Sequence, residues 1–153
     1  NLTALTGAIT NLISNAMQAL EHQRCVNAKQ NVIGKAVFCP QITVSVGEEY
    51  TNEQDYGVFT VTDNGIGLAQ KDINRLFEPF YTTKSQGTGL GLAVVSTVAK
   101  SHKGFVKCGN TQASGAFFAL YIPKHNTQTT LLNNLSDADS ALANKNLHDR
   151  STS

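Results

Sequence analysis

The sequence has few cysteines, no excess of charge of either sign and no long apolar run. Its three cysteines (Cys25, Cys39 and Cys108) are widely spaced without a Cys-x-x-Cys pair, which excludes a structural zinc site and favours free thiols in a reducing cytosol. The net charge of +1 gives no electrostatic basis for binding nucleic acid or an anionic membrane. No segment approaches the roughly 18 apolar residues of a membrane span, and no signal segment opens the chain. We therefore expect a soluble, cytoplasmic chain without nucleic-acid or direct membrane contact.

The chain nevertheless holds enough apolar residues for one globular domain. It has 153 residues, of which 41% are hydrophobic, so global disorder is excluded. The strand and helix patterns end at Pro123, and we expect residues 1–123 to fold as the domain. Residues 124–153 contain no Gly, Pro or aromatic residue and favour a polar, flexible tail. The alternative is one short amphipathic helix through Leu131, Leu132, Leu135, Ala138 and Leu142.

The order of helical and strand patterns predicts the fold class. Apolar residues recur at helical spacing from Leu2 to Leu20, with Asn11, Asn15 and Gln18 on the opposite face. The other expected elements are helices over residues 70–77 and 90–102, strands over 42–46, 58–63, 105–109 and 117–122, loops over 21–41 and 80–89, and a polar turn over 47–56. This order predicts an α/β two-layer sandwich whose mixed, mostly antiparallel sheet is covered on one face by helices.

Glycines are concentrated in two clusters, and five of the twelve fall between Gly65 and Gly91. The first cluster, Asp63-Asn-Gly-Ile-Gly-Leu68, follows a strand directly. Asp63 continues the more apolar row of that strand, where a carboxylate needs a hydrogen-bond donor. The amino group of an adenine is a suitable donor. An aspartate that only caps the turn is the simpler alternative.

The second cluster, Gly87-Thr-Gly-Leu-Gly-Leu92, leads directly into the helix expected from residue 90. The free amides at a helix N-terminus, together with the positive end of the helix dipole, form an anion site. The cluster lacks the Gly-Lys-Ser/Thr of a Walker motif and the preceding strand of a Rossmann fingerprint. A flexible glycine hinge is the alternative interpretation.

Two polar residues outside the glycine clusters could complete a site for phosphate and metal. Asn15, in the first helix, offers an amide oxygen of the kind that Mg²⁺ accepts beside phosphate oxygens and water. An asparagine that simply faces water is the alternative. Lys84, in the loop between the glycine clusters, could reach a terminal phosphate as a point charge.

In this order and spacing, the motifs resemble the catalytic, ATP-binding domain of sensor histidine kinases, within the wider GHKL superfamily that includes a heat-shock chaperone and mismatch-repair ATPases. The N box matches residues 11–20, the G1 box residues 63–68, the F box residues 77–80 and the G2 box residues 87–92. The residues of these motifs are most similar to those of nitrogen-regulatory and flagellar-regulatory kinases. The resemblance implies a Bergerat-type ATP-binding fold over residues 1–123.

The resemblance also implies a role for each site residue. Asn15 would bind Mg²⁺ together with the ATP phosphates, Asp63 would bind the adenine amino group, and Lys84 would act in catalysis as a lid contact to the phosphates. The other nucleotide-binding residues would be Gly65, Ile66, Gly67, Phe80, Gly87, Thr88, Gly89, Leu90, Gly91 and Leu92.

Asn11 bears on the reaction type. ATP-hydrolysing relatives carry at this catalytic position a glutamate that activates water, and a neutral amide is no general base. Asn11 therefore favours transfer of the γ-phosphoryl group of Mg-ATP to a histidine, with onward transfer to a response regulator. None of the four histidines is followed by the glutamate of a phosphoacceptor site, and the chain starts at the N box. We expect a monomeric fragment, truncated at its N-terminus, whose dimerisation and phosphoacceptor domain lies upstream.

Two departures from the family pattern leave other functions open. Gln18 stands where many sensor kinases carry a basic residue, and Ala116 stands where the family often has a threonine whose hydroxyl contacts the adenine. Both residues would suit a non-catalytic adenine-nucleotide-sensing module. A slow GHKL-type ATPase is the other alternative, and Asn11 speaks against it.

Overall fold

The computed structural model describes residues 1–29, 38–84 and 87–124. Its elements are α1 (Leu2–Lys29), β1 (Ile42–Thr51), β2 (Gln54–Asp63), the 3₁₀ turn η1 (Ile73–Arg75), α2 (Gly91–Ser101), β3 (Phe105–Asn110) and β4 (Ala116–Pro123). Chain contacts divide the protein into two units, Asn1–Pro123 and Lys124–Ser153. Apart from Lys124, the tail predicted for the second unit lies outside the described residues.

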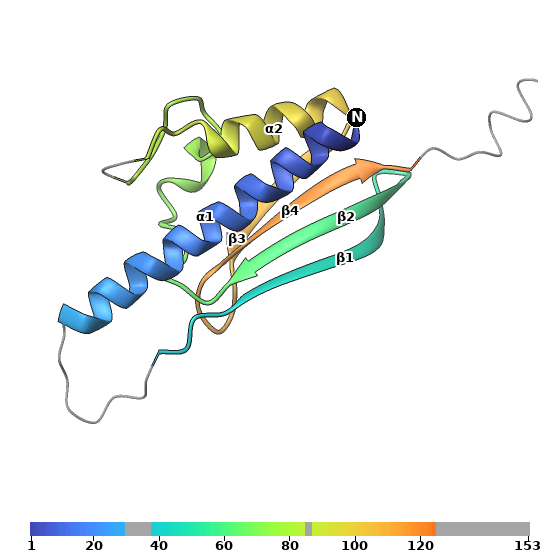
Figure 1. Cartoon of the computed structure of the whole chain (residues 1–153). Coiled ribbons are helices and arrows are strands. Elements are labelled where there is room, and N and C mark those ends of the chain that lie inside the picture. Colours follow the sequence, from blue (N-terminus) through green and yellow to red (C-terminus); the bar gives the residue numbers. More distant parts are fainter. Residues whose placement is uncertain (30–37, 85–86, 125–153) are drawn as a thin grey trace, which may run out of the picture. The chain divides into compact units, whose positions relative to one another are not determined.

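The four strands form one sheet in the order β1-β2-β4-β3. All three neighbouring pairs are antiparallel. Helices α1 and α2 lie side by side on one face of this sheet (Figure 1). The two-layer α/β sandwich is therefore confirmed, and the sheet is antiparallel throughout the described strands.

The main core lies between the two helices and the sheet. Helix α1 contributes buried residues four positions apart, from Ala8 to Leu20, and Leu12 is fully buried together with Val95 of α2 and Leu120 of β4. Leu2 was expected in this apolar row but is 79% exposed. It precedes Ala8 by six residues, which is about 240° around an α-helix, so it points away from the sheet.

The hairpin of β1 and β2 differs from the expected pattern of two short strands and a long polar turn. Both strands have ten residues, and their register runs from Ile42↔Asp63 to Thr51↔Gln54. The prediction of a polar turn over residues 47–56 was therefore wrong. The turn consists of Asn52 and Glu53, whose φ angles are 50° and 60°. Positive φ at both central residues matches the twist of a hairpin. Strand β1 lies at the edge of the sheet and is mostly exposed, so polar residues are tolerated along most of its length.

Two helix boundaries also differ from expectation. Helix α1 continues to Lys29, through residues that were expected to form a loop. Most of its side chains between Glu21 and Asn27 are exposed, and good helix formers extend a helix without an apolar face. The prediction of a helix over residues 70–77 was wrong, since only the turn η1 forms there.

Within the described ranges, no helix combines the length and hydropathy needed to span a bilayer.

Candidate functional site

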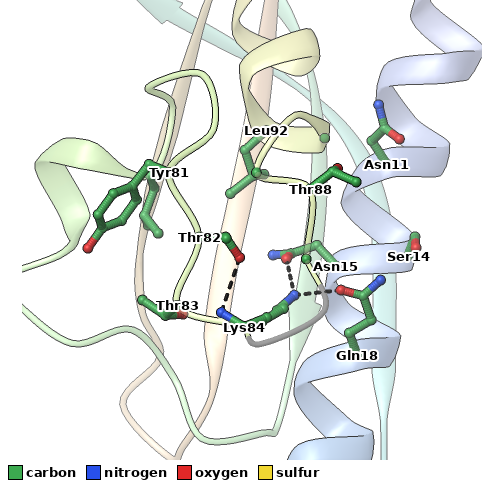
Figure 2. Close-up of a pocket in the computed structure, with 14 residues that line it drawn as sticks. Asn11, Ser14, Asn15, Gln18, Tyr81, Thr82, Thr83, Lys84, Thr88 and Leu92 are labelled. Carbon is green, nitrogen blue, oxygen red and sulfur yellow. Dashed lines mark hydrogen bonds between the residues drawn. The ribbon is translucent and has the colours of Figure 1, made fainter.

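A cavity of about 310 Å³ opens between α1, the N-terminus of α2 and the loop that precedes α2 (Figure 2). Polar side chains dominate its lining. The described residues that line it are Asn11, Ser14, Asn15, Gln18, Leu76, Tyr81, Thr82, Thr83, Lys84, Gly87, Thr88, Gly89, Gly91 and Leu92. Lys84 is the one charged side chain among them, so the charge of the lining favours an anion.

The N-terminus of α2 faces this cavity through Gly91 and Leu92. The first turn of α2 holds no acidic residue that would compete for its amides. Gly89 has φ +68°, and a Cβ there would lie 2.5 Å from the carbonyl carbon of Phe80. The amide of Phe80 donates to the Gly89 carbonyl at 3.0 Å. A glycine at position 89 thus allows the two ends of the loop to meet beside the helix N-terminus.

Lys84 connects this loop to α1. Its Nζ donates to Asn15 Oδ1 at 2.7 Å and to Gln18 Oε1 at 2.8 Å. Asn15 and Gln18 are three residues apart, so their side chains lie on the same face of the helix (Figure 2). Asn15 Oδ1 therefore already contacts a positively charged group, and a metal ligand must likewise offer an oxygen to a cation.

Burial lowers the pKa of the Lys84 ammonium, because a charged group loses hydration in the cleft. The negative charge of Asp63 acts in the opposite direction and raises this pKa. The two ends of the predicted nucleotide site are thus electrostatically coupled. A bound anion would act in the same direction as Asp63 and raise the pKa of Lys84, because it favours the protonated form.

Asp63 ends β2 and is 4% exposed. Its Oδ1 accepts hydrogen bonds from the amides of Gly65 at 2.8 Å and Ala116 at 3.4 Å. Both contacts use the same carboxylate oxygen, so neither occupies Oδ2. Ala116 has no side-chain hydroxyl to offer a nucleotide, and it contacts the carboxylate through its backbone amide.

The structure brings together eight of the predicted site residues at the cavity: Asn11, Asn15, Lys84, Gly87, Thr88, Gly89, Gly91 and Leu92. Six others do not line it: Asp63, Gly65, Ile66, Gly67, Phe80 and Leu90. Phe80 and Ile66 have exposed side chains, at 76% and 52%. The cavity thus contains the predicted phosphate and metal end, and Asp63 with its glycines lies outside it.

Sequence reasoning did not assign a site role to several lining residues, namely Ser14, Leu76, Tyr81, Thr82 and Thr83. Ser14 follows Asn11 by three positions, so helical spacing alone places it on the same side of α1. Thr82 and Thr83 adjoin Lys84 in sequence. Leu76 carried no polar signal that could have indicated a site.

The described residues hold no group of three or more His, Cys, Asp or Glu side chains that could bind a metal ion. A divalent ion here would therefore take most of its ligands from phosphate oxygens and water, as Mg²⁺ commonly does. Asn15 Oδ1 suits such an ion in chemistry and lies in the cavity.

Comparison with known proteins gives a family for this arrangement. The family model HATPase_c, described as "Histidine kinase-, DNA gyrase B-, and HSP90-like ATPase", matches residues 1–126. Sensor histidine kinase ZraS of Salmonella typhi is 35% identical over 119 residues, which cover 78% of this chain and 22% of that protein. Sporulation kinase E of Bacillus subtilis is 38% identical over 71 residues, covering 46% of this chain and 10% of that protein.

Solved structures show the same likeness. The catalytic domain of histidine kinase ThkA aligns with a TM-score of 0.60 and 26% identity, over 80% of this chain and 67% of that chain. Full-length ShkA in complex with AMPPNP aligns with a TM-score of 0.54 and 26% identity, over 78% of this chain and 21% of that chain.

Fold and cleft thus define an ATP-binding domain of the sensor-kinase class. The chain belongs to the HATPase_c family, and the part of the sensor histidine kinases that it matches is their catalytic domain. The resemblance inferred from the four ordered motifs is confirmed.

Proposed function

We propose that this domain binds Mg-ATP between α1, α2 and the loop carrying Lys84, and transfers the γ-phosphoryl group to a histidine on a separate dimerisation domain. A response regulator would receive the group in turn. The observation that carries the proposal is the pairing of a buried carboxylate, Asp63, with a cationic cleft at a helix N-terminus. An adenine nucleotide offers the matching groups, an amino donor at one end and phosphates at the other. The histidine kinase names of the relatives support the choice of acceptor.

The base end of the ligand is assigned to Asp63. Its Oδ1 is engaged by two backbone amides, so Oδ2 would accept from the adenine amino group. A charge-assisted hydrogen bond to a carboxylate is among the stronger kinds. Such a contact would distinguish adenine from a base that lacks a donor at that position.

The phosphate end is assigned to Lys84 and the amides at the start of α2. These groups would hold the transferring phosphoryl group in place and offset its charge, which is the main work of a protein in phosphoryl transfer. When bound, Mg²⁺ would supply further charge neutralisation, with Asn15 Oδ1 as its protein ligand. Because that oxygen now accepts from Lys84 Nζ at 2.7 Å, Lys84 would leave Asn15 and turn to the phosphates.

The transfer step needs no base from this chain. A histidine nitrogen of the acceptor domain attacks the γ-phosphorus, and a nitrogen–phosphorus bond forms as the bond to the β,γ-bridging oxygen breaks. ADP leaves with that electron pair, and the imidazole proton passes to a base of the acceptor domain. Asn11 lines the cavity and, as a neutral amide, activates no water.

A nucleotide-sensing module without catalysis is the second candidate. One contact favours it: Gln18 Oε1 accepts from Lys84 at 2.8 Å, so a neutral residue of α1 engages the cation that the described lining supplies. If that contact persisted with ATP bound, Lys84 would have fewer donors free for the phosphates.

A phosphotransfer assay discriminates these functions. The chain is mixed with ATP labelled on its γ-phosphate and with an acceptor domain that carries the histidine. Label on the acceptor that is stable in base and labile in acid supports histidine phosphorylation. An acceptor with its histidine replaced by alanine is the control. Nucleotide binding without label transfer would favour the sensing module, and free phosphate in the absence of acceptor would favour an ATPase.

A further inference from the structure

The segment Asn64–Leu68, which follows Asp63, belongs to no helix or strand. A side-chain carboxamide holds each of its ends. At the first end, Asn64 Nδ2 donates to the Cys39 carbonyl at 2.8 Å, and Asn64 Oδ1 accepts from the Gln41 amide at 2.8 Å. This contact ties the segment to the residues that precede β1.

Asn110, the last residue of β3, holds the other end. Its Oδ1 accepts from the Leu68 amide at 2.6 Å, and its Nδ2 donates to the Leu68 carbonyl at 2.9 Å. One residue thus gives and receives a hydrogen bond with the same partner, as in a hydrogen-bonded pair of antiparallel strands. The carboxamide of Asn110 thereby replaces a backbone partner for an irregular segment.

Packing adds to these hydrogen bonds at Gly67. This glycine has φ +74°, and a Cβ there would lie 2.7 Å from Asn110 Oδ1. The Asn110 side chain therefore lies close against the backbone of Gly67. Nearby, Ser114 Oγ donates to the Gly65 carbonyl at 3.0 Å. Residues from the end of β3 and the turn after it thus hold the segment next to Asp63.

We propose that Asn110 is a positioning residue for recognition of the adenine base, an inference that rests on the proposed function. The side-chain hydrogen bonds of Asn110 go to Leu68 and not to Asp63. Asn110 fixes Leu68 and Gly67, and through them the backbone against which the base would lie while its amino group meets Asp63 Oδ2. Without Asn110 the base still enters the site, but its amino group no longer has a fixed position relative to the carboxylate.

This proposal predicts an effect on specificity rather than on affinity alone. Purine riboside triphosphate lacks the 6-amino group of ATP and cannot donate to Asp63. Since a hydrogen bond to a charged group is lost, the wild type should bind it roughly 10- to 100-fold more weakly than ATP. Asn110→Ala should weaken ATP binding and leave purine riboside triphosphate nearly unchanged, so that the ratio of the two affinities falls about tenfold.

Titration calorimetry of the full chain with both nucleotides tests this. Asn74→Ala is the matched control, because Asn74 is an exposed asparagine of η1, outside the segment. Asn110→Asp is the second variant: it keeps the acceptor for the Leu68 amide and places a carboxylate oxygen against the Leu68 carbonyl. Its affinity ratio should lie between those of the wild type and Asn110→Ala. Asn110 is exposed, so thermal melting of both variants should remain cooperative.

A lowered ratio in Asn110→Ala and an unchanged ratio in Asn74→Ala support the proposal. An unchanged ratio in both position-110 variants, or an equal loss of affinity for both nucleotides, overturns it and leaves the adenine assignment of Asp63 intact. Equal binding of the two nucleotides by the wild type overturns the adenine assignment and the inference together.

Discussion

Replacing Asp63 by asparagine tests the assignment of the base end with little change of shape. The amides of Gly65 and Ala116 both donate to Oδ1. An asparagine must keep its oxygen on that side, because its own NH₂ group would meet two donors there. The NH₂ group is therefore directed to the position of Oδ2, where the adenine amino group would also donate.

The expected loss follows from these two changes. A hydrogen bond to a charged acceptor disappears, and a buried donor faces another donor. Because Asp63 is only 4% exposed, water cannot fully compensate for either change. Together they cost about 3–5 kcal/mol of binding free energy, or roughly a 100- to 4,000-fold weaker affinity for ATP.

Calorimetric titration with a non-hydrolysable ATP analogue measures this loss, with Asp55→Asn at the opposite end of β2 as the control. Circular dichroism and thermal melting should show that Asp63→Asn stays folded, since both amide contacts to the side-chain oxygen remain. An affinity within a factor of three of the wild type would refute the reasoning, because a neutral donor would then serve as well as the carboxylate.

Three further predictions address the cleft and the core. Burial lowers the pKa of free Lys84, and bound phosphates should raise it, so binding should take up a proton between these two pKa values. Nucleotide affinity should therefore fall as the pH rises through that interval. Calorimetry at several pH values should find this pH dependence missing in Lys84→Met. Asn11→Glu places a carboxylate in the cavity and should raise phosphate release without acceptor about 100-fold, measured colorimetrically; an unchanged rate would contradict the role given to position 11. Leu12→Ala empties a fully buried position and should lower the free energy of unfolding by about 2–5 kcal/mol in urea titrations, whereas Leu2→Ala, at an exposed position, should change it little.

Much of the fold could be predicted because burial leaves a periodic signal in the sequence. The apolar positions of α1 around Leu12 and Ala16, and the continuous apolar run of β4, both reflect contact with the core. The edge strand β1 could not be predicted to its full length, because its exposed side chains are free to be polar. The extension of α1 to Lys29 was missed for the same reason.

For the candidate site, the sequence could predict which residues take part better than it could predict which of them contact one another. Glycines before a helix and a carboxylate on an apolar row indicate their chemistry from local sequence alone. The bonds from Lys84 to Asn15 and Gln18 join residues 69 and 66 positions apart, and such contacts follow from tertiary packing. The same holds for Asn110, which lies outside every motif and meets Leu68 across 42 positions.

The two ends of the site differ in how far they are formed before a ligand arrives. The segment after Asp63 is held by Asn64 and Asn110, whereas at the other end the Asn15 oxygen is engaged by Lys84. Under the proposed function, the base would dock without rearrangement, whereas the phosphates would have to displace an existing hydrogen bond. ADP and ATP should then share one association rate constant, and the number of phosphates should set how long each nucleotide stays bound.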